Sequence, residues 1–206
     1  MKLQNNERLL LIGDSITDCG RREEPEQIGH GYVRLIRDYY RTMAPEKKLE
    51  IINRGIGGDR VTDLAGRWQT DVLDLRPDWL SISIGINDVW RQLDNHEMEQ
   101  VYPERFEEVY DDLLRQVKEQ TNAKIILMEP TIIEEEPNSK GNKMLIDYVE
   151  AVHRLQVKYD AILVPTHQAF QRYLKAQSGA LLTTDGVHMN SSGNMLMALT
   201  WIKALQ

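Results

Sequence analysis

Cysteine is nearly absent from this sequence. Cys19 is the single cysteine among 206 residues, so an internal disulfide cannot form. No pair or quartet of cysteine and histidine has the spacing of a zinc site, and we therefore expect no bound metal. A chain without disulfides suits a reducing compartment.

Long apolar runs are also missing. The apolar run of residues 9–12, before Gly13, is too short for the core of a signal peptide. No later stretch approaches the roughly 20 apolar residues that a membrane-spanning helix needs. We therefore expect an unexported, cytoplasmic protein without a membrane partner.

Basic residues are outnumbered. Lys and Arg together number 25 against 32 for Asp and Glu, which gives a formal net charge of -7. The adjacent basic pairs, Arg21-Arg22 and Lys47-Lys48, do not form a basic patch. Because a phosphate backbone would on average be repelled, nucleic acid is not expected as a partner.

Short apolar runs recur along the chain and alternate with helix-like stretches. Continuous apolar runs of this length indicate strands buried on both faces. The runs cover residues 9–12, 49–52, 79–84, 124–128 and 161–164, and the helix-like stretches cover 32–43, 61–75, 103–120, 144–159 and 191–205. Because the composition does not change along the chain, residues 1–206 are predicted to form one α/β domain with a five-stranded parallel sheet between two helical layers. The acidic segment 134–138 is interpreted as a solvated loop in preference to a metal site.

The residues after each apolar run merit attention, because functional groups of a parallel sheet gather beyond the carboxyl ends of its strands. Ser15, in Gly13-Asp14-Ser15, is a candidate nucleophile. By itself this tripeptide is weak evidence and is better explained by a serine that caps a helix. The glycine-rich segment around Gly58 leaves backbone N–H groups open to an anion, although it also suits a flexible turn.

Two further segments complete a possible acyl-transfer site. Asn87 follows the third run and offers an amide that could donate to an oxyanion, while an Asx turn is the alternative explanation. Near the C-terminus, Asp185 stands three residues before His188, a spacing that lets a carboxylate orient an imidazole. The cap-like residues after His188 leave a structural role for that loop open. Together with Ser15 and Gly58, these segments supply every part of a serine hydrolase site.

With these residues in order, the whole chain resembles the SGNH, or GDSL-type, hydrolases. The resemblance rests on Ser15 in IGDSITD, Gly58 in NRGIGGD, Asn87 in GINDVW, and Asp185 with His188 in DGVHMN. Ile16 departs mildly from the leucine that the family places after the serine. The resemblance implies a flavodoxin-like α/β/α sandwich, a catalytic triad of Ser15, Asp185 and His188, and an oxyanion hole from Ser15, Gly58 and Asn87. It also implies that no cofactor is used.

The longer strings LLLIGDSITDCGRR and SIGINDVWRQ resemble intracellular esterases that remove acetyl groups from xylan-derived sugars. This resemblance implies a small acetylated sugar as substrate. Thioesterase and lysophospholipase relatives of the same family are the alternative. The predicted substrate contacts are Asp14, Arg60, Trp90 and Arg91. Trp90 could equally fill the core or a subunit interface, so a homo-oligomer remains open.

Two classes without esterase activity are the alternatives, and the first, a flavodoxin-like or receiver-type signalling domain, shares this alternation of strands and helices. A receiver-type signalling domain would carry a lysine at the end of its last strand, and residues 163–166 contain none. An inert sugar-binding module would have no use for a serine, a histidine and an aspartate together. The sequence therefore favours a serine esterase.

Overall fold

The computed structural model of this chain describes residues 2–176 and 179–206. Across those residues, five parallel strands form one sheet in the order β2-β1-β3-β4-β5. The strands are β1 (Arg8–Gly13), β2 (Glu50–Gly55), β3 (Trp79–Ser83), β4 (Lys124–Met128) and β5 (Ile162–Val164). The predicted α/β class, with a five-stranded parallel sheet, is confirmed.

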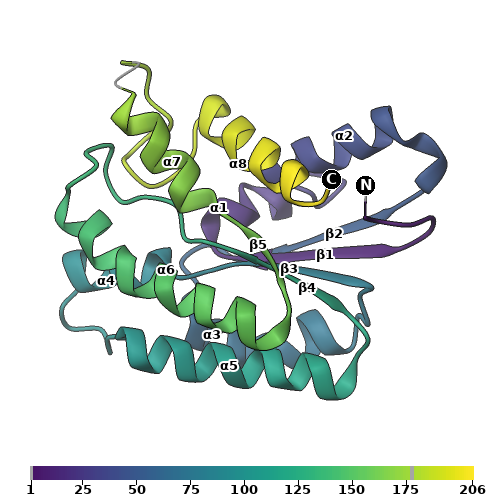
Figure 1. Cartoon of the computed structure of the whole chain (residues 1–206), viewed down its shortest axis with the longest axis horizontal. Helices are drawn as coiled ribbons and strands as arrows, with labels where there is room; N and C mark the ends of the chain where they lie inside the picture. The colour runs from purple at the N-terminus through teal and green to yellow at the C-terminus, as the bar shows by residue number, and fades with distance from the viewer. Residues whose placement is uncertain (1, 177–178) are drawn as a thin grey trace.

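Helices cover both faces of the sheet (Figure 1). One layer contains α1 (Ser15–Asp18), α2 (Tyr32–Met43), α7 (Thr166–Lys175) and α8 (Ser191–Ala204). The other contains α3 (Val61–Trp68), α4 (Ile86–Asp94), α5 (Pro103–Gln120) and α6 (Lys140–Tyr159). Every residue of β3 is buried, as expected for a central strand covered from both sides.

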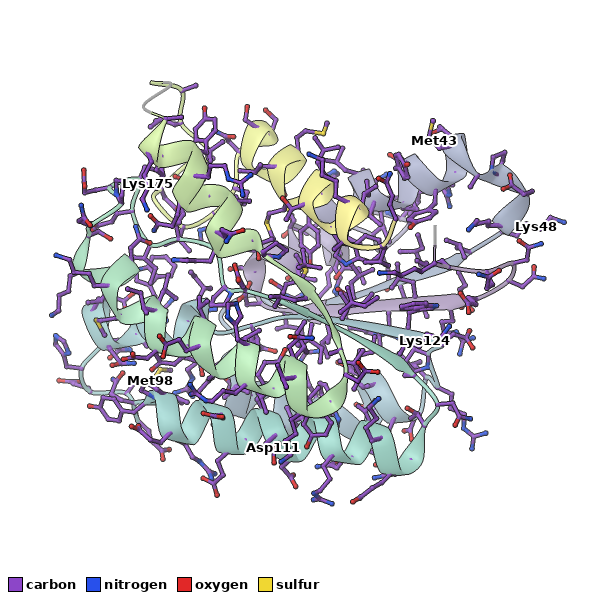
Figure 2. The ribbon with its side chains drawn as sticks, in the orientation of Figure 1. Met43, Lys48, Met98, Asp111, Lys124 and Lys175 are labelled. Atoms are coloured by element: carbon purple, nitrogen blue, oxygen red, sulfur yellow. The ribbon has the colours of Figure 1, made fainter. Side chains whose placement is uncertain are left out.

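The strand order reverses direction at β1. The chain passes from β1 to its neighbour β2 on one side and then to β3 on the other, which makes the carboxyl ends of β1 and β3 a topological switch point. Figure 2 shows the two ends of the sheet. Lys124, the first residue of β4, marks the amino ends of the strands, and Lys175, the last residue of α7, lies toward their carboxyl ends. Ser15 lies two residues after the end of β1 and Asn87 lies four residues after the end of β3, so both reach the switch point.

Several boundaries differ from the sequence prediction. Strand β2 extends to Gly55, because its last three residues continue the ladder with β1 although they are not all apolar. The helix predicted at 61–75 is α-helical only to Trp68 and continues as a π-helical turn, Gln69–Leu73. Helix α6 begins four residues early, because the Ser139 side chain accepts a hydrogen bond from the Asn142 N–H and caps it.

Three helices were not predicted: α1, α4 and α7. The first is a single turn, and the other two begin directly after strand ends without a long apolar stretch. Two short 3-10 turns, Arg21–Glu23 and Pro45–Lys47, were also not predicted. Among the described residues, no helix is both long and apolar enough to cross a membrane, and no three His, Cys, Asp or Glu side chains are grouped as a metal site.

Candidate active site

Ser15 is the first residue of helix α1 and is partly exposed. Asp14, not Ser15, caps this helix, because its Oδ1 accepts a hydrogen bond from the Ile16 N–H at 2.9 Å. The Ser15 hydroxyl therefore takes no part in the cap. Gly13 is required just before this turn: a Cβ there would lie 2.2 Å from the Ser83 carbonyl oxygen. The ends of β1 and β3 can approach this closely only with glycine at that position.

His188 lies beside Ser15, although 173 positions separate the two residues. Ser15 Oγ is 2.8 Å from His188 Nε2, and His188 Nδ1 is 2.6 Å from Asp185 Oδ2. When Nδ1 donates its proton to the carboxylate, a neutral ring leaves Nε2 as the acceptor for the serine hydroxyl. The three side chains thus form one continuous hydrogen-bonded chain.

The Asp185 carboxylate is held by its own loop as well as by the ring. Its Oδ1 accepts hydrogen bonds from the backbone N–H groups of Val187 at 3.0 Å and His188 at 2.8 Å. Partial burial would raise the pKa of Asp185, but the hydrogen bonds from the His188 ring and from these N–H groups hold that pKa below its ordinary value. Asp185 is therefore an ionised partner for the imidazole at neutral pH.

The glycine-rich segment after β2 approaches the serine. A Cβ on Gly57 would lie 3.8 Å from Ser15 Cβ, and Gly58 has a φ of +87°, which favours glycine. A Cβ on Gly58 would meet no heavy atom within 4 Å, so its backbone borders open space. Gly55 brings the segment here, because a Cβ on it would lie 2.1 Å from the Asp18 nitrogen.

Asn87 lies in the first turn of α4 and not in a loop or an Asx turn, as the sequence had left open. The residue is buried, and its Nδ2 donates to the Asp59 carbonyl oxygen at 3.0 Å. An asparagine amide carries two N–H donors, so this bond leaves one for another acceptor. Because Asp59 follows Gly58 directly, the same bond ties the glycine segment to α4.

Sequence reasoning missed Arg67, which joins these segments from helix α3. Its guanidinium contacts the Asp59 carboxylate at 2.7 Å and donates to the carbonyl oxygens of Arg54 at 2.8 Å and Gly13 at 3.2 Å. Burial raises the pKa of Asp59, while the positive charge of Arg67 opposes that shift. The sequence showed only an amphipathic helix around Arg67, and no local pattern indicated contacts with two strand ends.

Two buried carboxyl groups lie close to the site. Burial raises the pKa of Asp14 to about 7 and that of Asp88 to about 8. Asp88 accepts hydrogen bonds from the Val61 N–H at 3.1 and 3.3 Å, at the start of α3. The hydrogen bonds from the Val61 N–H lower the pKa of Asp88, but burial has the larger effect.

The predicted substrate contacts have different surroundings. The Trp90 ring lies 5.7 Å from the His188 ring in an edge-on arrangement, and the Arg91 guanidinium lies 4.8 Å above the Trp90 ring. Arg60 is turned to other partners, the Asp63 carboxylate at 3.1 Å and the Glu99 carbonyl oxygen at 2.7 Å. The prediction that Asp14 contacts the substrate is wrong, because only 2% of the residue is exposed and its carboxylate caps α1.

The sequence is similar to a family of known hydrolases and to a characterised esterase. The model of the GDSL-like lipase/acylhydrolase family matches residues 11–196. An acetylxylan esterase from Geobacillus stearothermophilus is 37% identical over 212 aligned positions, which cover 100% of this chain and 96% of that protein.

Solved structures agree with the sequence comparison. The crystal structure of the acetylxylan esterase Axe2 from Geobacillus stearothermophilus superposes with a TM-score of 0.93 at 36% identity, over 100% of this chain and 96% of that one. LAE5, an alpha/beta hydrolase from the metagenome of Lake Arreo in Spain, superposes with a TM-score of 0.92 at 34% identity, over 100% of this chain and 97% of that one.

Proposed function

The chain belongs to the GDSL-like lipase/acylhydrolase family and is a carboxylic ester hydrolase, and on that premise we propose that it removes acetyl groups from xylo-oligosaccharides or similar carbohydrates by a serine mechanism. The observation that carries the proposal is the hydrogen-bonded chain from Ser15 through His188 to Asp185, with lengths of 2.8 and 2.6 Å. The alternative of a thioesterase or lysophospholipase is not favoured, because the full-length relative and the superposed Axe2 structure are acetylxylan esterases.

The proposed reaction has two halves. His188 Nε2 takes the hydroxyl proton as Ser15 Oγ attacks the ester carbonyl carbon, and the same proton passes to the sugar oxygen as the alcohol leaves. Water then attacks the acetyl-enzyme, with His188 again as the base, and releases acetate. Asp185 orients the ring and stabilises its charged form in both halves.

The developing negative charge on the carbonyl oxygen needs donors that are already in place. We assign these to the backbone N–H groups of Ser15 and Gly58 and to the free amide N–H of Asn87. The bond from Asn87 to the Asp59 carbonyl supports this assignment, because it holds two of the three donors at a constant separation. One such donor contributes about 3 kcal/mol of transition-state stabilisation.

The aromatic ring beside the imidazole supports a carbohydrate substrate. Trp90 lies next to His188 and carries the Arg91 guanidinium on its ring, so an apolar plane and hydrogen-bond donors occur together at the rim of the site. Sugars bind to such combinations through their apolar faces and hydroxyl groups. We also retain the inferences of one domain over residues 1–206 and of a cytoplasmic location.

The test compares the wild-type protein with Ser15→Ala on acetylated xylo-oligosaccharides, aryl acetates, thioesters and lysolipids. We expect the acetylated sugars to be hydrolysed with the highest kcat/KM, and Ser15→Ala to lower turnover by about 10⁴-fold or more with an unchanged melting temperature. An organophosphorus reagent should label one serine in the wild type and none in the variant. Near-normal turnover by Ser15→Ala would exclude Ser15 as the nucleophile, and a preference for lysolipids would exclude the substrate class.

A further inference from the structure

The acidic segment 134–138, which the sequence indicates is a solvated loop, contains one glutamate that is turned inward. Glu135 is half-buried, whereas Glu134 and Glu136 on either side are exposed. The Glu135 carboxylate accepts hydrogen bonds from the backbone N–H of Leu182 at 2.9 and 3.1 Å and from that of Thr183 at 2.7 Å. The Thr183 hydroxyl is a further donor to the same carboxylate. A single side chain therefore binds two consecutive buried residues that lie 47 and 48 positions along the chain.

These two residues lead directly into the loop that carries Asp185 and His188. Thr183 pairs with Met189 in an antiparallel bridge, so the two ends of the loop lie side by side. Inside it, the Gly186 N–H donates to the Thr183 hydroxyl at 3.2 Å. The Glu135 carboxylate thus holds the base of the loop on which the imidazole and its carboxylate partner stand.

A second contact joins the same two segments. The backbone N–H of Glu134 donates to the Gly186 carbonyl oxygen at 2.8 Å, within the loop itself. The acidic segment is firmly held by the start of α6, where the Asn142 amide donates to the carbonyl oxygens of Glu134 at 3.1 Å and Glu136 at 2.8 Å. The backbone on both sides of Glu135 is therefore held by hydrogen bonds from the first turn of α6.

The loop keeps its own shape through internal bonds such as that from the Thr184 N–H to the His188 carbonyl oxygen at 2.8 Å, but these bonds do not set its distance from Ser15. The side chains of His188 and Asp185 are 37% and 46% exposed, so burial contributes little to their positions. Their hydrogen bond to one another fixes the ring relative to the loop, but not the loop relative to Ser15. Only a contact from outside the loop can set that second distance, and a misplacement of about 1 Å can lower turnover by about 100-fold.

We propose that Glu135 is a positioning residue that holds the Asp185 and His188 loop at hydrogen-bonding distance from Ser15. This inference rests on the proposed function, in which His188 is the base for Ser15. Glu135 contacts no reacting atom in this scheme and acts only through Leu182 and Thr183.

The experiment measures kcat and KM on an acetyl ester, with kcat expressed per serine that the organophosphorus reagent titrates. Glu135→Ala removes every acceptor, and Glu135→Asp keeps the charge but shortens the side chain by one methylene. We expect both to lower kcat by about 100-fold with little change in KM. Glu135→Gln should regain most of the lost turnover, because its amide oxygen can still accept from the N–H groups. The matched control Glu136→Ala removes an exposed carboxylate of the same segment and should behave as wild type.

A second readout needs no turnover. Because His188 Nδ1 lies 2.6 Å from Asp185 Oδ2, we expect the proton between them to give a far-downfield proton NMR signal, which should disappear when the loop loosens and water reaches the ring. We expect this signal in the wild type, Glu135→Gln and Glu136→Ala, and its loss in Glu135→Asp and Glu135→Ala while the methyl signals stay native. If Glu135→Ala does not fold, Glu135→Asp decides the matter alone.

Three results would overturn the proposal. They are wild-type kcat and an intact downfield signal in Glu135→Asp, equal losses in Glu135→Gln and Glu135→Asp, or an equal loss in Glu136→Ala. Failure of the proposed function looks different, because a wild-type protein that is not labelled at Ser15, or a Ser15→Ala variant that remains active, would show it. The NMR comparison among the glutamate variants would still report on the loop in that case.

Discussion

The carboxyl group that precedes the nucleophile is expected to weaken the fold as the pH rises. Asp14 is 2% exposed, and burial raises its pKa from an ordinary 3.8 to about 7, against a smaller opposing effect of the hydrogen bond from the Ile16 N–H. The perturbation is Asp14→Asn, which keeps an oxygen for the Ile16 N–H, since asparagine is an equally good helix cap. It removes the ionisable group without emptying the site.

The sign of the effect follows from proton binding. Between the unfolded pKa of 3.8 and the folded value of about 7, the folded protein holds a proton that the unfolded chain has released. Stability therefore falls with rising pH across that window and becomes constant above it. Each pH unit changes the free energy of unfolding by about 1.4 kcal/mol per group while the folded group stays protonated, so the fall from pH 5 to 7, where Asp14 is half ionised, is about 2 kcal/mol.

The assay is urea denaturation of the wild type and Asp14→Asn at pH 5, 6, 7 and 8. Titrating groups that do not interact with Asp14 are common to both proteins, so they cancel in the difference between the two free energies of unfolding. We expect Asp14→Asn to gain about 2 kcal/mol relative to the wild type between pH 5 and 7, and less than about 0.5 kcal/mol more at pH 8. Asp160→Asn is the control, because Asp160 is exposed and has a φ of +50° that asparagine tolerates. Parallel curves for the wild type and Asp14→Asn would refute a raised pKa for Asp14.

Two further outcomes follow from the contacts around the site. Asn87→Ala should lower kcat on an acetyl ester by about 10²-fold to 10³-fold with little change in KM, and a loss of less than a few-fold would make Asn87 a structural residue. Arg67→Met should lower the free energy of unfolding at neutral pH by about 3 kcal/mol or more, because it leaves the mostly buried Asp59 carboxylate unpaired. Urea denaturation of Arg67→Met with and without Asp59→Asn measures this pairing, since the second change should recover part of the loss, and equal stability of the single variant and the wild type would contradict it.

The parallel sheet was predictable because its signal is local. The inner strands β1, β3 and β4 are buried on both faces, so each left a short run of apolar residues with turn or helix-start residues behind it. The strand at 124–128 agrees with β4 at both ends. Where polar residues continue a ladder, as Asn53 and Arg54 do in β2, the apolar pattern ended too early.

The sequence predicted the residues that could carry out the reaction, but not the residues that hold them in place. Ser15, Gly58, Asn87, Asp185 and His188 stand at strand ends or in short motifs, where residue type and spacing carry the information. By contrast, an aspartate is usually exposed, whereas Asp14 is buried and its side chain caps helix α1. Glu135 and Glu136 are adjacent glutamates in one acidic segment, yet only the Glu135 carboxylate accepts hydrogen bonds from the residues before Asp185.

The sequence by itself therefore determined the strands, most of the helices and the identity of the residues that could carry the chemistry, because burial and backbone preference act over a few neighbouring positions. The tertiary structure alone decided the order of the strands, the 2.8 Å approach of Ser15 to His188, and the contacts of Arg67 and Glu135. These depend on segments far apart in the chain that meet only when the helices have packed onto the sheet. No local pattern of residues records which distant partner a side chain will meet.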